Sequence, residues 1–469
     1  MKKHGKQMSR QSSIEAATDF FENGHFLSGL RDLVAIRTES QDPQFRNCLE
    51  HYMSSVIADK LRPLGFDWQI YDNPDPAGVP FLVAERFEDR GLPTVLIYGH
   101  GDVVPGMEDQ WSNDLDPWAV TVVGEKWYGR GTVDNKGQHW TALSAIHCLI
   151  ADEGRLGFNT RFLLDMSEEI GSPGMHVFCR QHRHVLNADV LIASDGPRLQ
   201  ADRPTIYMGA RGNLNFNLRA RFRKRNFHSG NWGGVLKDPV IRLSHAIASI
   251  ADSNGRLLVE GWRPEPPSPA IKEALADCPI GGSDDDTSVD RDWGEPGLTL
   301  AERLYAWNSF AVVAISSGDS DNPVNAIQGE AIAACQLRFV VGIEPKSALE
   351  DLRAHLDAAG FDDIAIEPNH AVDLAATRQD PDHPWVEFVA NSIEDTTGQP
   401  PVRLPNLAAS LPNDCFSDIL GMPTVWIPHS YPECGQHAPD EHALAPILKE
   451  GLQIMTGVFW DIGNALPRP

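Results

Sequence analysis

The 469-residue chain carries 40 Lys and Arg against 65 Asp and Glu, a formal net charge of −25. A chain of this length exceeds one ordinary hydrophobic core, so we expect two domains. The acidic balance argues against a nucleic-acid partner and against an anionic membrane surface, because both require clustered basic side chains.

The first ten residues are basic but are followed by polar residues, which predicts no conventional secretion signal. No segment approaches the roughly 18 apolar residues that a membrane span needs. Seven cysteines without a C-x-x-C pair indicate thiols in a reducing compartment rather than a disulfide framework. The sequence therefore predicts a cytoplasmic location.

In the first half of the chain, short apolar runs alternate with helical patterns, as in a sheet built from βαβ units. Strands are expected at residues 94–98, 161–166 and 190–193. A helix is expected between the first two, because apolar residues recur at helical spacing after Asp134 and Asn135: Trp140, Leu143, Ile146 and Leu149.

The pattern changes near Pro204, where Leu214, Phe216 and Leu218 alternate with polar residues, which predicts a half-exposed antiparallel strand. Further along, the sequence predicts a helix at 240–250, an irregular excursion rich in Pro, Asp and Gly at 262–300, strands near 311–315 and 331–341, and a helix around 346–358. The earlier pattern returns after about Pro381, with a helix from Trp385 and an apolar run at 423–427.

These patterns predict an α/β fold with two domains. The larger domain is discontinuous and covers residues 1–205 and 380–469, and a smaller α+β domain covers residues 206–379.

Metal-capable side chains follow each of three expected strands: His100 and Asp102, then Glu168 and Glu169, then Asp195. In open α/β sheets, ligands bind beyond the carboxyl ends of the strands. One acidic residue after a strand is more often a cap or turn residue, but three such strand ends in one sheet favour a shared site. The adjacent carboxylates would repel each other if buried, unless cations neutralise them.

A set of histidine and carboxylate ligands without cysteine suits catalytic Zn²⁺, and it also tolerates Mn²⁺ or Co²⁺. Two such ions about 3.5–4 Å apart can share a hydroxide and polarise a scissile carbonyl. Asp102 stands close enough to His100 in the chain to accept the second N–H of the imidazole and to fix its tautomer.

Five motifs in order resemble those of the M20 metallopeptidases, which include carnosinase-type dipeptidases, carboxypeptidases and N-acyl-amino-acid deacylases. The motifs are GHGDVVP (99–105), GRGTVDNKG (129–137), SEEIGSPG (167–174), ASDG (193–196) and GQHAPDEH (435–442). The resemblance implies a di-metal aminopeptidase-like α/β catalytic domain interrupted by a smaller α+β lid and dimerisation domain.

The resemblance also implies a role for each residue of the predicted centre. His100 and Asp195 would hold one metal ion, and Glu169 with His437 the other. Asp134 would bridge the two ions and would be followed by a cis peptide bond. Glu168 would act as the general base that takes a proton from the bridging water and passes it to the leaving amine.

The segment NFHSGNWGGVLKDP (226–239) resembles the lid motif of the family, in which a histidine stabilises the oxyanion and, in dimeric relatives, reaches the opposite subunit. His228 takes this position, and its alternative is a turn histidine in a Gly-rich loop. An Asn226 stands where many relatives have Asp.

Three further residues match substrate-binding positions of the family: Asn325, Arg338 and Ser410. Arg338 would clamp a substrate carboxylate with two hydrogen bonds, or would form a salt bridge on an alternating strand. Ser410 lies in AASLP (408–412), where Ala408 and Ala409 replace glycines of the family and reduce backbone freedom.

The length and the 262–300 excursion resemble carnosinase-type dipeptidases more than the compact deacetylases and desuccinylases of the family, and this resemblance implies a hydrolase of dipeptides or short peptides with a free carboxylate. The rival prediction is an N-acyl-amino-acid deacylase, similar to acetylornithine deacetylases and succinyl-diaminopimelate desuccinylases. A non-catalytic binding protein on the same fold stays open, although no expected ligand or base is missing. The expected partners are a peptide or N-acyl amino acid substrate and a second copy of the chain, bound through the lid domain.

Overall fold

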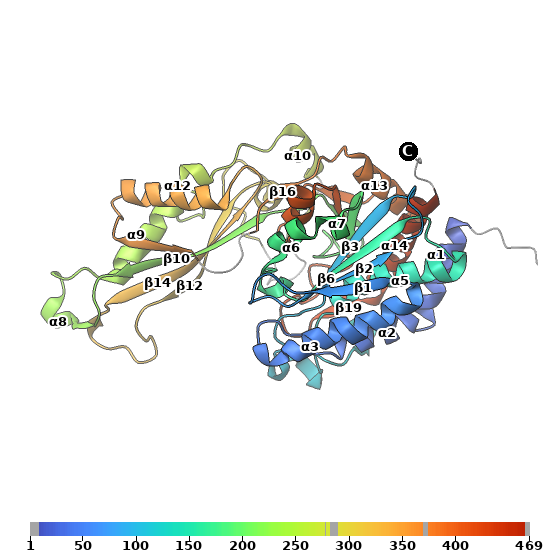
Figure 1. The fold of residues 1–469 in the computed structure, drawn as a ribbon. Coiled ribbons are helices and arrows are strands. Elements are labelled where there is room, and N and C mark those ends of the chain that lie inside the picture. Colours follow the sequence, from blue (N-terminus) through green and yellow to red (C-terminus); the bar gives the residue numbers. More distant parts are fainter. Residues whose placement is uncertain (1–8, 277, 282–288, 369–373, 465–469) are drawn as a thin grey trace, which may run out of the picture. The chain divides into compact units, whose positions relative to one another are not determined.

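The structure is a computed structural model that describes residues 9–276, 278–281, 289–368 and 374–464. The chain forms two compact units (Figure 1). Unit 1 comprises Met1–Gly209, Gln379–Leu404 and Pro412–Pro469, and unit 2 comprises Ala210–Arg378 and Pro405–Leu411.

The segment Pro405–Leu411 corrects the predicted assignment of all of 380–469 to the larger domain. Its backbone is tied to unit 2, because the amide of Arg211 donates hydrogen bonds to the carbonyl oxygens of Leu407 and Ala409, each at 3.2 Å. Ser410 therefore belongs to unit 2, whereas the chain from Pro412 onward belongs to unit 1.

The core of unit 1 is an eight-stranded mixed sheet. Its strands, in spatial order, are β1 (Asp67–Tyr71), β2 (Phe81–Arg86), β6 (Asn159–Asp165), β3 (Thr94–His100), β7 (Val190–Ala193), β18 (Thr424–Trp426), β8 (Thr205–Tyr207) and β17 (Val402–Leu404). The central strands β6, β3, β7 and β18 are parallel to one another, whereas β1, β2 and β6 pair antiparallel. The three strands predicted in this unit are confirmed as β3, β6 and β7, and the apolar run at 423–427 contains β18.

Helices cover the sheet of unit 1. They are α1 (Arg10–Glu22), α2 (His25–Val34), α3 (Arg46–His51), α4 (Ala58–Leu61), α5 (Lys136–Glu153), α6 (Met175–Gln181), α7 (Arg183–Leu186), α13 (Pro384–Thr397) and α14 (Ala445–Asn464). Val95 and Ile97 of β3 share a core with α1, α2, α5, α13 and α14. Tyr98 contacts the ring of Phe416, which lies in a π-helical segment, Cys415–Leu420, packed on α6. Strand β3 is thus buried on both faces, as parallel strands usually are.

Helix α5 begins directly after the peptide bond between Asp134 and Asn135, which is cis as the resemblance implied. The helix ends at Gly154, whose φ of 74° lies in the left-handed region that favours glycine. The predicted helix is confirmed. A smaller sheet in the same unit joins β4 (Thr121–Val123), β5 (Lys126–Tyr128) and β19 (His442–Leu444).

Unit 2 is built on a four-stranded antiparallel sheet with the order β12 (Ser309–Ser316), β14 (Glu330–Phe339), β10 (Gly212–Arg221) and β15 (Ile364–Pro368). The longer helices α9 (Pro239–Ile250) and α12 (Pro345–Ala358) pack on this sheet (Figure 1). The shorter elements are α8 (Ser229–Trp232), α10 (Pro269–Ala274), α11 (Leu300–Tyr305), β11 (Phe227–His228), β13 (Ala326–Ile327) and β16 (Thr377–Arg378). The strand β9 (Gly209–Ala210) contains the last residue of Met1–Gly209 and the first residue of Ala210–Arg378.

Alternation places Leu214, Phe216 and Leu218 of β10 in the core of unit 2, where they share a cluster with Leu243 of α9. Burial of each such side chain stabilises the unit by about 1.5–3 kcal/mol. Helix α9 starts where predicted because the carboxylate of Asp238 accepts hydrogen bonds from the amides that open it.

The predicted excursion at 262–300 contains α10, and its residues 277 and 282–288 lie outside the described residues. Within the described ranges, no helix is long and apolar enough to cross a membrane.

Candidate metal centre

The predicted ligands of unit 1 gather at the carboxyl ends of neighbouring parallel strands. His100 is the last residue of β3, Glu168 and Glu169 lie in a 3-10 turn after β6, and Asp195 follows β7. Because β6, β3 and β7 are adjacent and parallel, their ends meet at one edge of the sheet.

Two groups of candidate metal ligands form at this edge and share Asp134. The first consists of His100, Asp134 and Asp195, and the second of Asp134, Glu169 and His437. His100 Nε2 lies 3.0 Å from Asp134 Oδ1 and 3.5 Å from Asp195 Oδ2. His437 Nε2 lies 2.9 Å from Asp134 Oδ2 and 3.0 Å from Glu169 Oε2. We call these five residues the candidate metal centre.

Two buried atoms of the candidate metal centre indicate that its side chains fit cations. His100 Nε2 makes no hydrogen bond despite its nearby carboxylates, and neither does Glu169 Oε1. A buried polar atom without a partner costs about 1–3 kcal/mol, so such atoms are rare in folded proteins. An imidazole nitrogen and carboxylate oxygens that converge in this way are the donor set of zinc and related cations.

The carboxylates at the centre are held in an environment that disfavours their charge. Burial, with the charge of Asp134, raises the pKa of Glu169 to about 7. Burial also raises the pKa of Glu168 well above its usual range, and the neighbouring carboxylates add to this effect. Bound cations would reverse the shift, because positive charge favours the ionised carboxylates.

Asp102 holds the turn that carries Glu168 and Glu169, a contact that the sequence did not predict. Its two carboxylate oxygens accept hydrogen bonds from the amides of Glu168 at 3.0 Å and Glu169 at 3.1 Å. His100 Nδ1 lies 3.1 Å from the backbone oxygen of Asp102 and 3.5 Å from its carboxylate. The backbone oxygen is therefore the nearer partner of the imidazole, and the carboxylate instead positions the two glutamates.

A comparison with known families is consistent with this geometry. Residues 96–461 match Peptidase family M20/M25/M40. The chain belongs to this family.

Two curated relatives cover most of the chain. The Beta-Ala-His dipeptidase of Rattus norvegicus is 27% identical over 465 residues, which is 94% of this chain and 93% of the relative. The cysteinylglycine-S-conjugate dipeptidase of Corynebacterium striatum is 25% identical over 395 residues, 82% of this chain and 83% of the relative. The solved structure of the dipeptidase Dug1p from Saccharomyces cerevisiae shares the fold, with a TM-score of 0.83, 20% identity, and coverage of 98% of this chain and 99% of that chain.

One pair of residues in the M20 motifs was missed from sequence. Arg130 and Glu441 lie inside two of the motifs, GRGTVDNKG and GQHAPDEH, and form an ion pair with 2.7 Å between Nη1 and Oε2. Glu441 Oε1 also accepts hydrogen bonds from the amides of Gly131 and Val133. The spacing of a single glutamate does not predict such a role. The position of Glu441 in one motif and of Arg130 in another is the sequence signal that could have identified the pair.

The other predicted residues of the M20 pattern lie in unit 2. His228 and Asn325 are exposed, and the backbone oxygen of Asn325 accepts a hydrogen bond from the amide of Ser229 at 2.8 Å. Arg338 lies on β14 and its Nη1 donates a hydrogen bond to Ser410 Oγ at 2.7 Å. The structure thus brings Arg338 and Ser410 together within unit 2.

The three departures from the M20 pattern are accommodated locally. Ala408 and Ala409 are not among the described residues with positive φ, so alanine causes no backbone strain there. Asn226 Oδ1 accepts a hydrogen bond from the amide of Gly329 at 3.0 Å, a role that an amide oxygen fills as well as a carboxylate.

Proposed function

We propose that the chain is a di-metal dipeptidase that hydrolyses the amide bond of dipeptides or short peptides with a free carboxylate. The observation that carries the proposal is the pair of ligand groups that share Asp134, with Glu168 beside them. The names of the relatives support the reaction, because both curated relatives described above are dipeptidases.

In this proposal His100 and Asp195 would hold one cation and Glu169 and His437 the other, and Asp134, which both ligand groups share, would be a ligand of each. Bound divalent cations polarise the scissile carbonyl and generate a nucleophile from water at neutral pH. Zn²⁺ suits the donor set best, and Mn²⁺ or Co²⁺ would also be accepted.

Glu168 takes the role of general base. Its carboxylate makes no hydrogen bond within the described part of the chain, so both oxygens are available to a substrate water. Asp102 fixes the backbone amide of Glu168 and so holds the base at a defined place. Glu168 then delivers the proton to the leaving amine.

Arg338 and Ser410 are proposed to bind the substrate carboxylate. Burial lowers the pKa of Arg211 to about 10, and the charge of nearby Arg338 adds to the effect. Two guanidinium groups that repel each other in this way would be stabilised by an anion between them, and a bidentate hydrogen bond to carboxylate is the interaction arginine forms best.

His228 is proposed to stabilise the oxyanion. Its Nδ1 accepts a hydrogen bond from the amide of Gly230 at 3.1 Å, so in the neutral ring the proton is on Nε2. The exposed Nε2–H is then a donor whose direction is fixed by the turn. Asn325 directly precedes β13, whose Ala326 pairs with His228 of β11, and it is proposed to contact the same part of the substrate.

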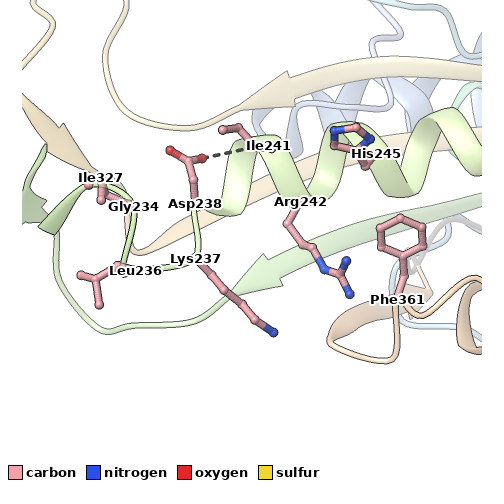
Figure 2. A pocket seen from close by; sticks show the side chains of 10 residues that line it. Gly234, Leu236, Lys237, Asp238, Ile241, Arg242, His245, Ile327 and Phe361 are labelled. Carbon is pink, nitrogen blue, oxygen red and sulfur yellow. Dashed lines mark hydrogen bonds between the residues drawn. The ribbon is translucent and has the colours of Figure 1, made fainter.

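A homodimer through unit 2 is also proposed. Strand β12 is an edge strand, and its side chains Val313 and Ile315 are 67% and 54% exposed. An exposed, apolar edge strand is a template for pairing with another chain. The same unit has an open hollow of about 790 Å³ (Figure 2). It is lined by the exposed Ile241 and by Arg242 of α9, together with Lys237 and Phe361. We place the dimer in a reducing compartment, the cytoplasm.

The proposed function is tested by hydrolysis of a panel of dipeptides and N-acyl amino acids after chelation and after addition of Zn²⁺, Mn²⁺ or Co²⁺. Chelator-sensitive cleavage of dipeptides, restored by metal, is expected. Cleavage confined to N-acyl amino acids would replace the dipeptidase with a deacylase, and no cleavage with any metal would favour a binding protein.

The dimer is tested by mixing two inactive parents, His228→Ala and Glu168→Ala. If His228 acts on the opposite subunit, one of the two sites in a mixed dimer has both residues, so activity returns. A monomer in sedimentation, or mixed dimers without activity, would contradict the arrangement.

A further inference from the structure

A second cluster of ligand-type side chains lies in unit 1, separate from the candidate metal centre. It consists of His176, Asp414 and Cys415. His176 lies in the first turn of α6, and Cys415 is the first residue of the π-helical segment Cys415–Leu420 that packs on this helix, with Asp414 directly before it. None of the three residues has a part in the proposed hydrolysis.

The geometry of the cluster is convergent. One nitrogen, one oxygen and one sulfur of these residues all lie within 4.8 Å of one another, and His176 Nε2 is 2.6 Å from Asp414 Oδ2. Tetrahedral Zn²⁺ with bonds of about 2.0–2.3 Å separates its ligand atoms by roughly 3.3–3.8 Å, so small side-chain shifts suffice for coordination.

An unpartnered atom points to a missing ligand. Asp414 is only 5% exposed, and its Oδ1 is buried without a hydrogen-bond partner. An ion pair with His176 accounts for Oδ2 alone. A carboxylate of this kind is costly to bury unless every oxygen is engaged, and a cation is the partner that would engage it.

The candidate metal centre has the same signature. There, His437 Nε2 lies 3.0 Å from Glu169 Oε2, while Glu169 Oε1 is buried without a partner. In both clusters, one oxygen of a carboxylate contacts a histidine nitrogen, and the other oxygen of the same carboxylate has no hydrogen-bond partner. They differ in the third donor, which in the second cluster is the thiol of Cys415.

We propose that His176, Asp414 and Cys415 bind a thiophilic divalent cation, Zn²⁺, which fastens helix α6 to the Cys415–Leu420 segment. Thiolate and imidazole select such a cation over Mg²⁺ or Ca²⁺. His176 has a side chain that is 25% exposed, which leaves an entry path and room for a water as the fourth ligand.

Binding must be accompanied by proton release. Burial raises the pKa of Cys415 well above its usual range, and the neighbouring thiol of Cys179 adds to the effect. Cys415 is therefore a neutral thiol without metal, and on binding its proton passes to solvent as the metal–sulfur bond forms. The cation would rigidify α6, which follows the turn that carries Glu168 and Glu169.

Co²⁺ titration of the full-length, reduced, metal-free protein tests the proposal. A thiolate bound to Co²⁺ gives an intense near-ultraviolet charge-transfer band, and histidine and carboxylate ligands do not. Since the candidate metal centre contains no cysteine, the band reports on the second cluster alone. We expect the band in the wild type, and its absence at every Co²⁺ concentration would overturn the proposal.

Variants assign the band to its ligands. Cys415→Ser should abolish it, and Asp414→Asn, which keeps the side-chain shape, should weaken Co²⁺ binding at this site at least 10-fold. Cys434→Ser is the matched control, because Cys434 is also buried and lies near His437 in the chain. A band lost in Cys434→Ser but kept in Cys415→Ser would refute the assignment.

The outcome is independent of the proposed hydrolase. Asp134→Ala disrupts the candidate metal centre and should leave the thiolate band unchanged, with one bound Co²⁺ per chain remaining by metal analysis. Loss of the band in Asp134→Ala would contradict a separate site, and peptidase activity is not needed for either reading.

Discussion

Arg130 Nη1 donates a hydrogen bond to Glu441 Oε2 at 2.7 Å, and each of the two side chains is only 1% exposed. The other oxygen of Glu441 accepts hydrogen bonds from the amides of Gly131 and Val133 at 2.9 and 3.1 Å. The buried pair therefore fixes the loop that leads into Asp134, the residue shared by both ligand groups.

Glu441→Ala should destabilise the protein by about 3–5 kcal/mol, because it leaves Arg130 buried without its counter-charge. The free energy of unfolding from urea titration measures the effect. Metal affinity should fall as well, since the loop before Asp134 loses its acceptor. Glu350→Ala is the control, because Glu350 is 69% exposed in a 4.0 Å pair with Lys346 and should cost less than about 0.5 kcal/mol. Equal losses of unfolding free energy in the two variants would argue against a role of Glu441 in fixing the loop before Asp134.

Asp102→Ala should lower kcat by about 10–100-fold while retaining His100 at its place. The variant removes the acceptor for the amides of Glu168 and Glu169, but the backbone oxygen near His100 Nδ1 remains. Asp102→Asn keeps one acceptor oxygen, so its kcat should fall less than that of Asp102→Ala. Steady-state kinetics with metal analysis would check this, and a complete loss of metal with unchanged kcat in reloaded enzyme would point instead to the predicted tautomer role.

Glu168→Gln should retain both metal ions and lose about 10²–10⁴-fold in kcat, the usual contribution of a general base. Asp134→Ala, in contrast, should lose metal from both groups because it removes their shared ligand. Metal content by mass spectrometry and peptide hydrolysis separate the two effects. Normal turnover by Glu168→Gln would remove the assigned base, and full metal occupancy in Asp134→Ala would remove the bridge.

The sequence predicted the strands and the ligands they deliver because both depend on local patterns. Short apolar runs mark β3, β6 and β7, and the polar residues after each run lie at the carboxyl ends of these strands. The antiparallel pair β1 and β2 at one side of the sheet was not predicted. Strand β1 is mostly exposed, and its apolar and polar residues show no clear alternation.

The remaining features depend on contacts between distant segments. The partners in Arg130–Glu441 are 311 positions apart, and those in the Asp414–His176 pair are 238 apart. No local period reports such a contact. Likewise, the place of Ser410 in unit 2 follows from backbone hydrogen bonds to Arg211, which the sequence of AASLP does not reveal.

Stability should decline in acid because of His429, which is 1% exposed and has both ring nitrogens without partners. Burial lowers the pKa of His429 well below its usual 6.5, and the charge of Arg198 adds to the effect. Below about pH 6.5 the unfolded chain therefore binds a proton that the folded chain does not bind. The contribution of neutral His429 to the free energy of unfolding is present above pH 6.5 and is lost as the pH falls.

His429→Leu should remove about 1 kcal/mol of the stability difference between about pH 6.5 and pH 5.5, since the imidazole of the unfolded chain goes from about half to almost fully protonated over this range. Urea unfolding of chelated protein at both pH values measures it, with the exposed His184→Gln as control. A pH dependence that is identical in His429→Leu and wild type would exclude His429 as its source.

Arg338→Ala should lower kcat/KM for a dipeptide about 10–150-fold, the equivalent of the 1.5–3 kcal/mol of a hydrogen bond to a charged group, mainly through KM. The same dipeptide with an amidated C-terminus should already be a poor substrate of the wild type and should change little in the variant. Arg219→Ala is the matched control, because Arg219 lies on the neighbouring strand β10 and is paired to Glu367 at 2.8 Å. If Arg338→Ala impaired both substrates equally, its hydrogen bond to Ser410 would hold the structure of unit 2 rather than the substrate carboxylate.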